Sequence, residues 1–380
     1  MNTIIVLSLL LKAAVSIPNA DDKLHIYALP VGQGDCTVIQ CPKGNGDPDK
    51  GVVSIIDAGS STSDVGIDGQ GIVKYLKGTK LNYVFLTHAD TDHLSYIDDI
   101  LDYYGKVMWK QFPVYHPCSW NKYGCYIHSK YANPKRIPYC HNIKSCHGEN
   151  KFHIGSDVLD HPALNLCPNY QPNIYAANAV KLSVVASAYK WCLDHKAHNG
   201  DSLILKITHG QTSTLITGDF ELLTKKDMEN FLDHAGSDLR SHIYKLSHHG
   251  ALKANQKQFL NAIQAKYVFS SSGYMYGHPR CEIFQYYDTK LLPDNTKAGH
   301  LYTCFNHFDN SPVRYLPSKF TTKKPIYVTS VLYGDNNGLA ESHNMVVIFR
   351  IGWKKDINVI LRPLGNERPY KKWYPNPPEN

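Results

Sequence analysis

Two histidines and two aspartates crowd into a six-residue stretch that directly follows an apolar run. The run at residues 83–86 predicts a buried strand, and His88, Asp90, Asp92 and His93 come immediately after it. Burying imidazoles and carboxylates without partners costs free energy. These four groups must therefore be satisfied by each other or by a ligand.

Backbone geometry indicates how the four side chains can meet. Residues two apart on an extended backbone point to the same side, which groups His88 with Asp90. A turn after them lets Asp92 and His93 converge from another direction. Carboxylates and imidazoles at this density suit divalent metal ions, and one shared pocket suits two ions. The alternative is a surface loop in which Asp92 or Ser95 caps the next helix, but a cap does not require histidines.

Strand-like segments outnumber helix-like segments and come in runs. Strands are expected at residues 24–29, 36–40, 52–56, 83–86, 182–186, 202–208, 214–217, 243–246, 266–270, 326–330, 345–351 and 358–361. Helices are expected at residues 71–76, 95–104, 221–234 and 256–265. This order favours an α/β protein built of sheets layered with helices.

Six further short motifs accompany the metal-type stretch. They are "VGQGD" (31–35), "IIDAG" (55–59), "NGDSLILK" (199–206), "LITGD" (215–219), "LSHHG" (246–250) and "YGHP" (276–279). With the His-x-Asp-x-Asp-His signature, they resemble the metallo-β-lactamase superfamily. The resemblance is to the branch that holds the hydrolase domain of DNA-uptake competence proteins and the phosphorylcholine esterases, and it covers residues 24–290. It implies an αββα sandwich and a metal-dependent hydrolase.

The resemblance also implies seven metal ligands. His88, Asp90 and His248 would hold one ion, Asp92, His93 and His278 the second, and Asp219 would bridge both. His248 is preferred to His249 because it comes first after the strand. Where many superfamily members place another histidine, this branch has Asn-x-x-Ser, here Asn199 and Ser202, so His195 and His198 are interpreted as ordinary polar residues.

The expected chemistry follows from two adjacent cations. They lower the pKa of a bridging water to give a hydroxide nucleophile, and they polarise the substrate. The expected catalytic residues are Asp92, which also holds an ion, Asp57, which orients a ligand or the water, and His249, which protonates the leaving group. The ions are expected to be zinc, with manganese as the alternative.

A phosphodiester suits such a site best, and one basic segment favours nucleic acid as the substrate. Residues 106–151 hold eight basic residues and one acidic residue, a difference that equals the whole formal charge of +7. Aromatic residues are interleaved with them, a combination that contacts a nucleic-acid backbone and stacks on bases. We expect an insertion at residues 105–180 that binds substrate through Lys130, Lys135, Arg136 and Lys144, with Asn199 as a further substrate contact.

Several alternatives stay open. The basic segment could be a solvated, disulfide-bonded flap, or "CHNIKSCHG" could be a zinc knuckle, although its spacing is too wide for the common pattern. The protein could instead be a small-molecule hydrolase acting on a choline phosphodiester, lactone or β-lactam. A non-enzymatic binding protein on the same fold is the third possibility, and the filled ligand positions argue against it.

The first residues predict export. Residues 1–16 read as a signal peptide, with cleavage after residue 20 as the other candidate, before a hydrolase domain at 21–365 and a loose tail at 366–380. All ten cysteines follow the signal, so disulfides are the default. No later segment predicts a membrane span, and the oligomeric state cannot be read from the sequence.

Overall fold

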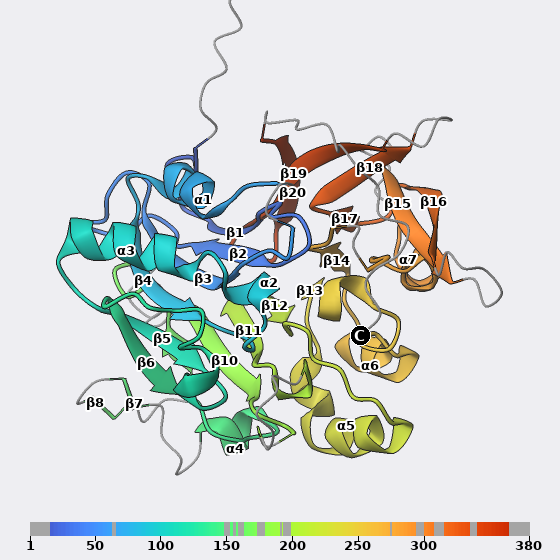
Figure 1. Cartoon of the computed structure of the whole chain (residues 1–380), viewed down its shortest axis with the longest axis horizontal. Coiled ribbons are helices and arrows are strands. Elements are labelled where there is room, and N and C mark those ends of the chain that lie inside the picture. Colours follow the sequence, from blue (N-terminus) through green and yellow to red (C-terminus); the bar gives the residue numbers. More distant parts are fainter. Residues whose placement is uncertain are drawn as a thin grey trace, which may run out of the picture.

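Two large β-sheets form the centre of the molecule in the computed structural model (Figure 1). The structure describes residues 16–62, 66–147, 153–154, 157–158, 163–172, 179–190, 192, 199–273, 276–293, 300–307, 315–334 and 340–364. Within these ranges, the strand and helix regions expected from the sequence are present, with shifts of a few residues at their ends.

The first sheet has nine strands in the order β18-β19-β1-β2-β3-β4-β5-β6, and β20 also pairs with β19. Its strands are β1 (Leu24–Ala28), β2 (Cys36–Gln40), β3 (Val52–Ala58), β4 (Lys80–Phe85), β5 (Phe112–His116), β6 (Ala132–Arg136), β18 (Ser330–Gly334), β19 (Ala340–Ile351) and β20 (Ile357–Pro363). The strands from β3 to β6 run parallel to one another. Their carboxyl ends therefore share one edge of the sheet.

The second sheet has seven strands in the order β17-β14-β13-β12-β11-β10-β9. They are β9 (Leu164–Asn165), β10 (Val180–Ala186), β11 (Ile204–His209), β12 (Thr212–Ile216), β13 (Ile243–Lys245), β14 (Tyr267–Ser270) and β17 (Ile326–Val328). The strands β12, β13, β14 and β17 are parallel. Two separate hairpins pair β7 (His153–Ile154) with β8 (Asp157–Val158), and β15 (His300–His307) with β16 (Tyr315–Thr322).

Helices cover the outer face of each sheet (Figure 1). The helices are α1 (Gly69–Leu76), α2 (Thr91–Leu94), α3 (Ile97–Met108), α4 (Ile143–His147), α5 (Lys225–Leu239), α6 (Lys257–Ile263) and α7 (Cys281–Lys290). Three short 3₁₀ helices lie in loops: η1 (Trp120–Lys122), η2 (Asn199–Asp201) and η3 (Ser247–Gly250). The helices α1 and α3 pack on the first sheet, and α5, α6 and α7 pack on the second.

The alternation of side chains along the strands builds these layers. In β1, Ile26 and Ala28 pack against Leu205 and Ile216 of the second sheet, whereas Tyr27 between them packs on the helix side. Successive strand residues face opposite sides, so a strand that is apolar at every position is buried between two layers. The αββα sandwich implied by the sequence resemblance is confirmed.

Four disulfides cross-link the described part of the chain, as the default for an exported protein predicts. The pairs are Cys41–Cys167, Cys118–Cys192, Cys140–Cys146 and Cys281–Cys304. Cys36 is buried in β2 and Cys125 is exposed, and both are free thiols. The Cys140–Cys146 pair uses the two cysteines of "CHNIKSCHG", which removes the zinc-knuckle alternative because oxidised cysteines cannot hold zinc.

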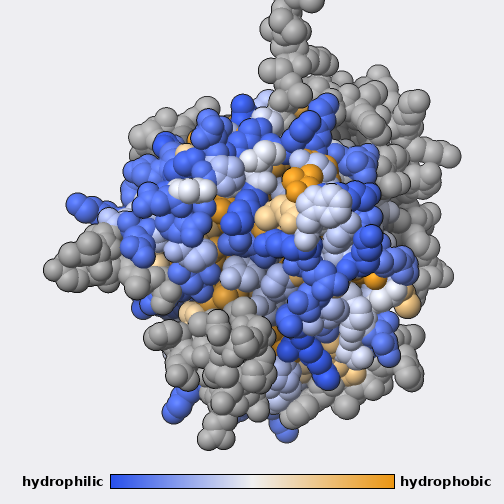
Figure 2. Space-filling model, turned by 90° about the vertical axis from the view of Figure 1, so that its left-hand side faces the viewer, coloured by the Kyte–Doolittle hydropathy of each residue, from blue (hydrophilic) through white to orange (hydrophobic). Residues whose placement is uncertain are grey.

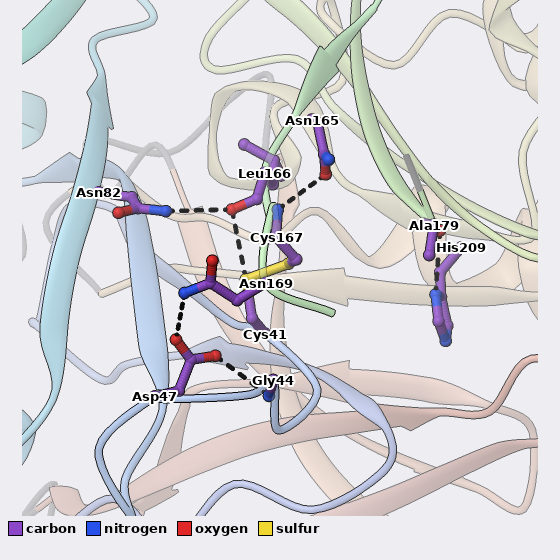
Figure 3. The surroundings of a disulfide bond; sticks show 10 residues. All are labelled: Cys41, Gly44, Asp47, Asn82, Asn165, Leu166, Cys167, Asn169, Ala179 and His209. Carbon is purple, nitrogen blue, oxygen red and sulfur yellow. Dashed lines mark hydrogen bonds between the residues drawn. A yellow bond between two sulfur atoms is a disulfide. The ribbon is translucent and has the colours of Figure 1, made fainter. Parts of the chain in front are cut away.

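The disulfide Cys41–Cys167 ties the two sheets together beyond the end of β2 (Figure 3). Beside it, Asn82 of β4 donates a hydrogen bond to the carbonyl of Leu166 at 3.3 Å, and Asn169 donates to Asp47 at 2.8 Å. The cross-link closes a long loop, which in the chain-entropy account stabilises the fold by about 3–5 kcal/mol.

The segment expected to be an insertion at residues 105–180 carries disulfide-bonded cysteines, but its first part is not a separate flap. The strands β5 and β6 continue the first sheet beyond β4. Sequence patterning missed both strands because prolines, Pro113 and Pro134, interrupt them; Pro134 lies in β6, an edge strand, which tolerates proline. The face of the molecule that carries α3 and β6 is mostly hydrophilic, with small apolar patches (Figure 2).

Candidate metal centre

Loops at the carboxyl ends of the parallel strands carry the site residues of both sheets. Asp57 is the last residue but one of β3, and the stretch from His88 to His93 follows β4. In the second sheet, Asp219 follows β12 and the pair His248–His249 follows β13. The sandwich thus brings together motifs that lie up to 192 positions apart in the chain, at the edge where α/β sheets place their sites.

Four of these residues form a compact group of ligand atoms. The group is Asp92, His93, Asp219 and His249, with one nitrogen or oxygen atom of each within 4.8 Å of the others. Asp219 lies at its centre: its Oδ1 is 3.2 Å from Nε2 of His93, and its Oδ2 is 3.4 Å from Nε2 of His249. The Nε2 atom of His249 is also 3.2 Å from Oδ2 of Asp92.

His88 and Asp90 form a second half beside this group. The Nε2 atom of His88 is 3.5 Å from Oδ2 of Asp90. The ring centroids of His88 and His93 are 4.1 Å apart. The pair His88–Asp90 is therefore in direct contact with the four-residue group through His93. The sequence expectation that His88 and Asp90 face the same way therefore agrees with their placement.

Unpaired atoms show that these residues fit a metal ion. Nε2 of His88, Nε2 of His93 and Oδ1 of Asp219 are buried and have no hydrogen-bond partner among the described residues. Leaving such groups unpaired costs about 1–3 kcal/mol each. A cation satisfies two lone pairs that face each other, and oxygen and imidazole donors suit zinc or manganese.

Hydrogen bonds behind the rings orient their Nε2 atoms toward the centre. Nδ1 of His93 is 2.8 Å from Oδ2 of Asp57, and Nδ1 of His249 donates to the carbonyl of Ser271 at 2.7 Å. Asp57 is held in turn by the backbone N–H and hydroxyl of Thr87, at 2.7 and 2.6 Å. A ring that donates from Nδ1 presents its Nε2 lone pair, which is the form that binds metal.

The backbone is strained at these positions. Asp57, His248 and His249 have φ values of 55°, 48° and 53°, in the left-handed region that residues with a β-carbon rarely adopt. Gly218, at φ 54°, approaches the side chain of Thr87 so closely that a β-carbon would lie 2.4 Å from its hydroxyl oxygen. Strain of this kind occurs where a functional geometry requires it.

In the metal-free protein, the carboxylates and imidazoles shift each other's pKa. Burial favours neutral His93, but the charges of Asp219 and Asp57 outweigh it and hold the pKa of His93 well above its usual value. Burial likewise opposes protonation of His249, yet Asp219 and Asp92 raise its pKa to about 10. Burial favours the neutral acid of Asp92, and the hydrogen bond and charge of His249 and the charge of His93 lower its pKa to about 2. Protons therefore occupy the imidazole rings of His93 and His249, while Asp92 is an anion, until a metal ion displaces those protons.

The structure places His249, rather than His248, in the ligand group. The sequence expectation favoured His248 because it comes first after the strand, but the left-handed turn directs the buried ring of His249 to Asp92 and Asp219. Nε2 of His248 is 3.7 Å from Oδ2 of Asp219, and its ring is partly exposed. Nδ1 of His248 lies 2.8 Å from Oε2 of Glu221 and 3.3 Å from the amide nitrogen of Asn199. The geometry thus favours the reverse of the expected roles.

His278 lies beside the site but outside the four-residue group. Its ring centroid is 5.6 Å from that of His248. Burial, together with the neighbouring His248 and His249, holds the pKa of His278 well below its usual value, so the ring is neutral. Its Nδ1 is buried without a hydrogen-bond partner among the described residues. A ligand role for His278 stays a prediction.

Three residues at the site had no assigned role in the sequence expectation. Glu221 follows Asp219 by two positions, and Asp35 ends the "VGQGD" motif. Lys245 is 1% exposed and forms an ion pair with Asp35. A lysine within the apolar stretch "HIYKL" was the signal that could have found this pair, since lysine is almost never fully buried unless it is paired.

The four basic residues expected to bind a substrate are spread over two elements and a loop. Lys130 precedes β6 and Arg136 ends it, so they lie at opposite ends of a strand roughly 13 Å long at about 3.3 Å per residue. Lys135 and Arg136 are adjacent in the strand and face opposite sides. Lys144 lies on α4, which packs against β10 of the other sheet.

Among known proteins, sequence similarity is confined to a short part of the chain. No family model matches the chain. A short stretch is similar to the competence protein ComA of Neisseria gonorrhoeae, with 37% identity over 83 residues. This match covers 21% of the chain and only 12% of that protein's length.

Solved structures with a similar arrangement include metallo-β-lactamase fold proteins. One is YhfI of Bacillus subtilis, with 12% identity and a TM-score of 0.41 over 70% of this chain and 93% of that chain. Another is CmlA, a diiron β-hydroxylase of Streptomyces venezuelae, with 10% identity and a TM-score of 0.35 over 68% of this chain and 49% of that chain. A third is the metallo-β-lactamase SMB-1, with 8% identity and a TM-score of 0.32 over 68% of this chain and 81% of that chain. At these scores, none of them bears on which reaction this chain catalyses.

Proposed function

We propose that the protein is a metal-dependent phosphodiesterase with a two-ion centre. The observation that carries this proposal is the buried Nε2 of His93, which faces Oδ1 of Asp219 at 3.2 Å, while neither atom has a hydrogen bond of good geometry to the described residues. We assign one ion to Asp92, His93, Asp219 and His249, and the other to His88, Asp90 and the shared Asp219. Two bound divalent ions supply Lewis acidity and a water of lowered pKa.

In this proposal the chain's own residues orient the ligands and move a proton. Asp57 and Ser271 hold the rings of His93 and His249 so that their Nε2 atoms face Asp219. We assign protonation of the leaving-group oxygen to His248, which is partly exposed and is oriented from behind by Glu221 at 2.8 Å. The pKa of His248 is raised, since Asp219 and Glu221 outweigh the effect of its burial, so it carries the required proton near neutral pH.

A groove lined by residues of α5, α6 and α7 and the loops before them supports a polyanionic substrate such as nucleic acid. It has a volume of about 450 Å³, and Lys225, Lys253 and Lys257 line it together with Leu223 and Leu252. Leu223 lies four residues after Asp219 and Leu252 three residues after His249, so two lining residues follow the loops that carry the site. This groove replaces the dispersed residues of the 106–151 segment as the proposed binding surface for flanking phosphates.

The test is a substrate panel with protein loaded with zinc or manganese. We expect hydrolysis of a bis-aryl phosphate and of single-stranded DNA or RNA, with no turnover of a β-lactam or lactone. A choline phosphodiester is the second candidate, on the resemblance to phosphorylcholine esterases. If fully loaded protein leaves every phosphodiester intact, the reaction class is wrong.

We further propose that the protein is secreted. Four disulfides are consistent with an oxidising compartment. No helix in the described part of the chain has the length and apolar character needed to cross a membrane.

The proposed signal peptide lies almost wholly outside the described residues, as does the C-terminal tail. Ile17 is buried and donates a backbone hydrogen bond to Tyr75, so cleavage after residue 16 keeps a hydrogen bond that cleavage after residue 20 removes. Sequencing the mature amino terminus from culture medium decides between them.

A further inference from the structure

A buried ion pair lies directly behind the candidate metal centre. Lys245 ends β13, and its ammonium group contacts the carboxylate of Asp35, with both residues 1% exposed. The same ammonium group donates to the carbonyl of Gly218 at 3.2 Å, one residue before Asp219. Lys245 therefore links the "VGQGD" loop to the loop that carries the shared carboxylate.

Asp35 is close enough to the two ligand histidines to disturb them. Its carboxylate is 3.6 Å from Nδ1 of His93 and 3.9 Å from Nδ1 of His249. These are the nitrogens that pair with Asp57 at 2.8 Å and with Ser271 at 2.7 Å. Without a partner of its own, a buried carboxylate at this distance would compete for both N–H groups.

We propose that Lys245 is a positioning residue of the metal centre: it neutralises Asp35, so that Nδ1 of His93 stays with Asp57, Nδ1 of His249 stays with Ser271, and both Nε2 atoms face Asp219. The inference rests on the metal centre of the proposed function. It gives Lys245 no contact with substrate or metal, and its effect passes through Asp35 and Gly218.

The charge of the site agrees with this role. Five aspartates belong to the cluster: Asp35, Asp57, Asp90, Asp92 and Asp219. With neutral ligand histidines, Lys245 and two divalent ions carry an equal positive charge. The fixed cation thus completes the neutralisation of a buried site, where an uncompensated charge is costly.

Replacing Lys245 with methionine separates positioning from simple charge repulsion. Removing a nearby cation would by itself strengthen the binding of a divalent ion. If Lys245 instead positions the ligands, Lys245→Met should weaken zinc affinity at least tenfold, within the range of about 10–100-fold for partners that orient metal ligands. The double variant Asp35→Asn with Lys245→Met leaves no unpaired buried charge, and its zinc affinity should return to within about threefold of the wild type.

The measurement is zinc affinity by competition with a chromophoric chelator, alongside the rise in melting temperature when zinc is added and the visible spectrum of the cobalt-loaded protein. Lys206→Met is the matched control, because Lys206 lies on β11 and donates to the carbonyl of Asp238 at 2.9 Å, away from the ligand group. A merely structural role would lower the melting temperature with and without zinc equally and would leave the cobalt spectrum unchanged.

The outcomes separate the inference from the function on which it rests. Wild-type protein that binds no zinc contradicts the metal centre itself. Wild-type protein that binds zinc, with Lys245→Met binding it equally or more tightly, overturns the role of Lys245. If Lys245→Met alone does not fold, the double variant decides: wild-type-like affinity supports the proposal, and affinity more than tenfold weaker contradicts it.

Discussion

Replacing Asp219 with asparagine should remove at least one ion from the centre. Among the described residues, Asp219 alone has a carboxylate within 3.7 Å of His93, His248 and His249 at once. The substitution keeps the shape of the side chain and removes one negative charge that both ions share. Its histidine neighbours outweigh the effect of burial and hold the pKa of this group well below the usual value, so it is an anion in the folded state.

The magnitude follows from Coulomb's law. Two unit charges 4 Å apart interact by about 4 kcal/mol at an effective dielectric constant near 20, and a divalent ion doubles this. The amide oxygen restores part of the loss, so we expect at least about 4 kcal/mol, or roughly a thousandfold in affinity. Phosphodiester turnover should fall by a similar factor, because it depends on both ions.

The assay is metal content per chain after gel filtration, with turnover measured on the same samples. Asp49→Asn serves as the control, because its side chain is 90% exposed and pairs only with Lys43 among the described residues. The circular dichroism spectrum should not change in either variant, since the core and disulfides are untouched. Two ions per chain and near-normal turnover in Asp219→Asn would refute the shared-ligand assignment.

Four further predictions follow from the same geometry. His249→Ala should lose an ion, whereas His248→Ala should keep both and lower kcat, which metal analysis and kinetics on the same preparations distinguish; the opposite pattern restores the expectation from the sequence. Metal uptake at pH 7 should release protons, because the pKa of His249 is about 10 before binding, and calorimetry in buffers of different ionisation enthalpy measures this release. The raised pKa of His249 also contributes to the stability of the metal-free fold: the contribution is complete below about pH 6.5 and is lost by about pH 10. The free energy of unfolding, measured with a chelator present, should therefore fall across that interval. A free energy that does not change with pH there would contradict the geometry. Lys253→Gln with Lys257→Gln should flatten the slope of log affinity against log salt by roughly 0.7–0.9 for each lysine–phosphate interaction that is removed, while bis-aryl phosphate turnover stays constant.

Local sequence pattern was enough to predict sheets layered with helices and the strand ends where the site lies, and the resemblance to a known family added the αββα sandwich. Apolar strands followed by His, Asp and Gly-Asp pairs mark strand ends, and parallel strands bring such ends together. The strands β5 and β6 were missed, because Pro113 and Pro134 break the alternating pattern and only pairing with β4 makes them part of the sheet.

The assignment between His248 and His249 could not be made from the sequence. Two adjacent histidines offer the same chemistry, and their directions depend on φ values of 48° and 53° that arise in the folded turn. Spacing likewise could not show that Lys245 pairs with Asp35, because their 210-residue separation is bridged only by the packing of two sheets. Spacing also could not show how the expected substrate-binding residues are arranged: Lys135 and Arg136 lie in β6, whereas Lys144 lies on α4.

The most direct test of the central claim is a crystal structure of the zinc-loaded protein with anomalous scattering data collected at the zinc edge. We expect two anomalous peaks flanking Asp219, one beside His88 and Asp90 and the other among Asp92, His93 and His249. No peak at Asp219, or peaks only at surface histidines, would contradict the metal centre and with it the proposed phosphodiesterase.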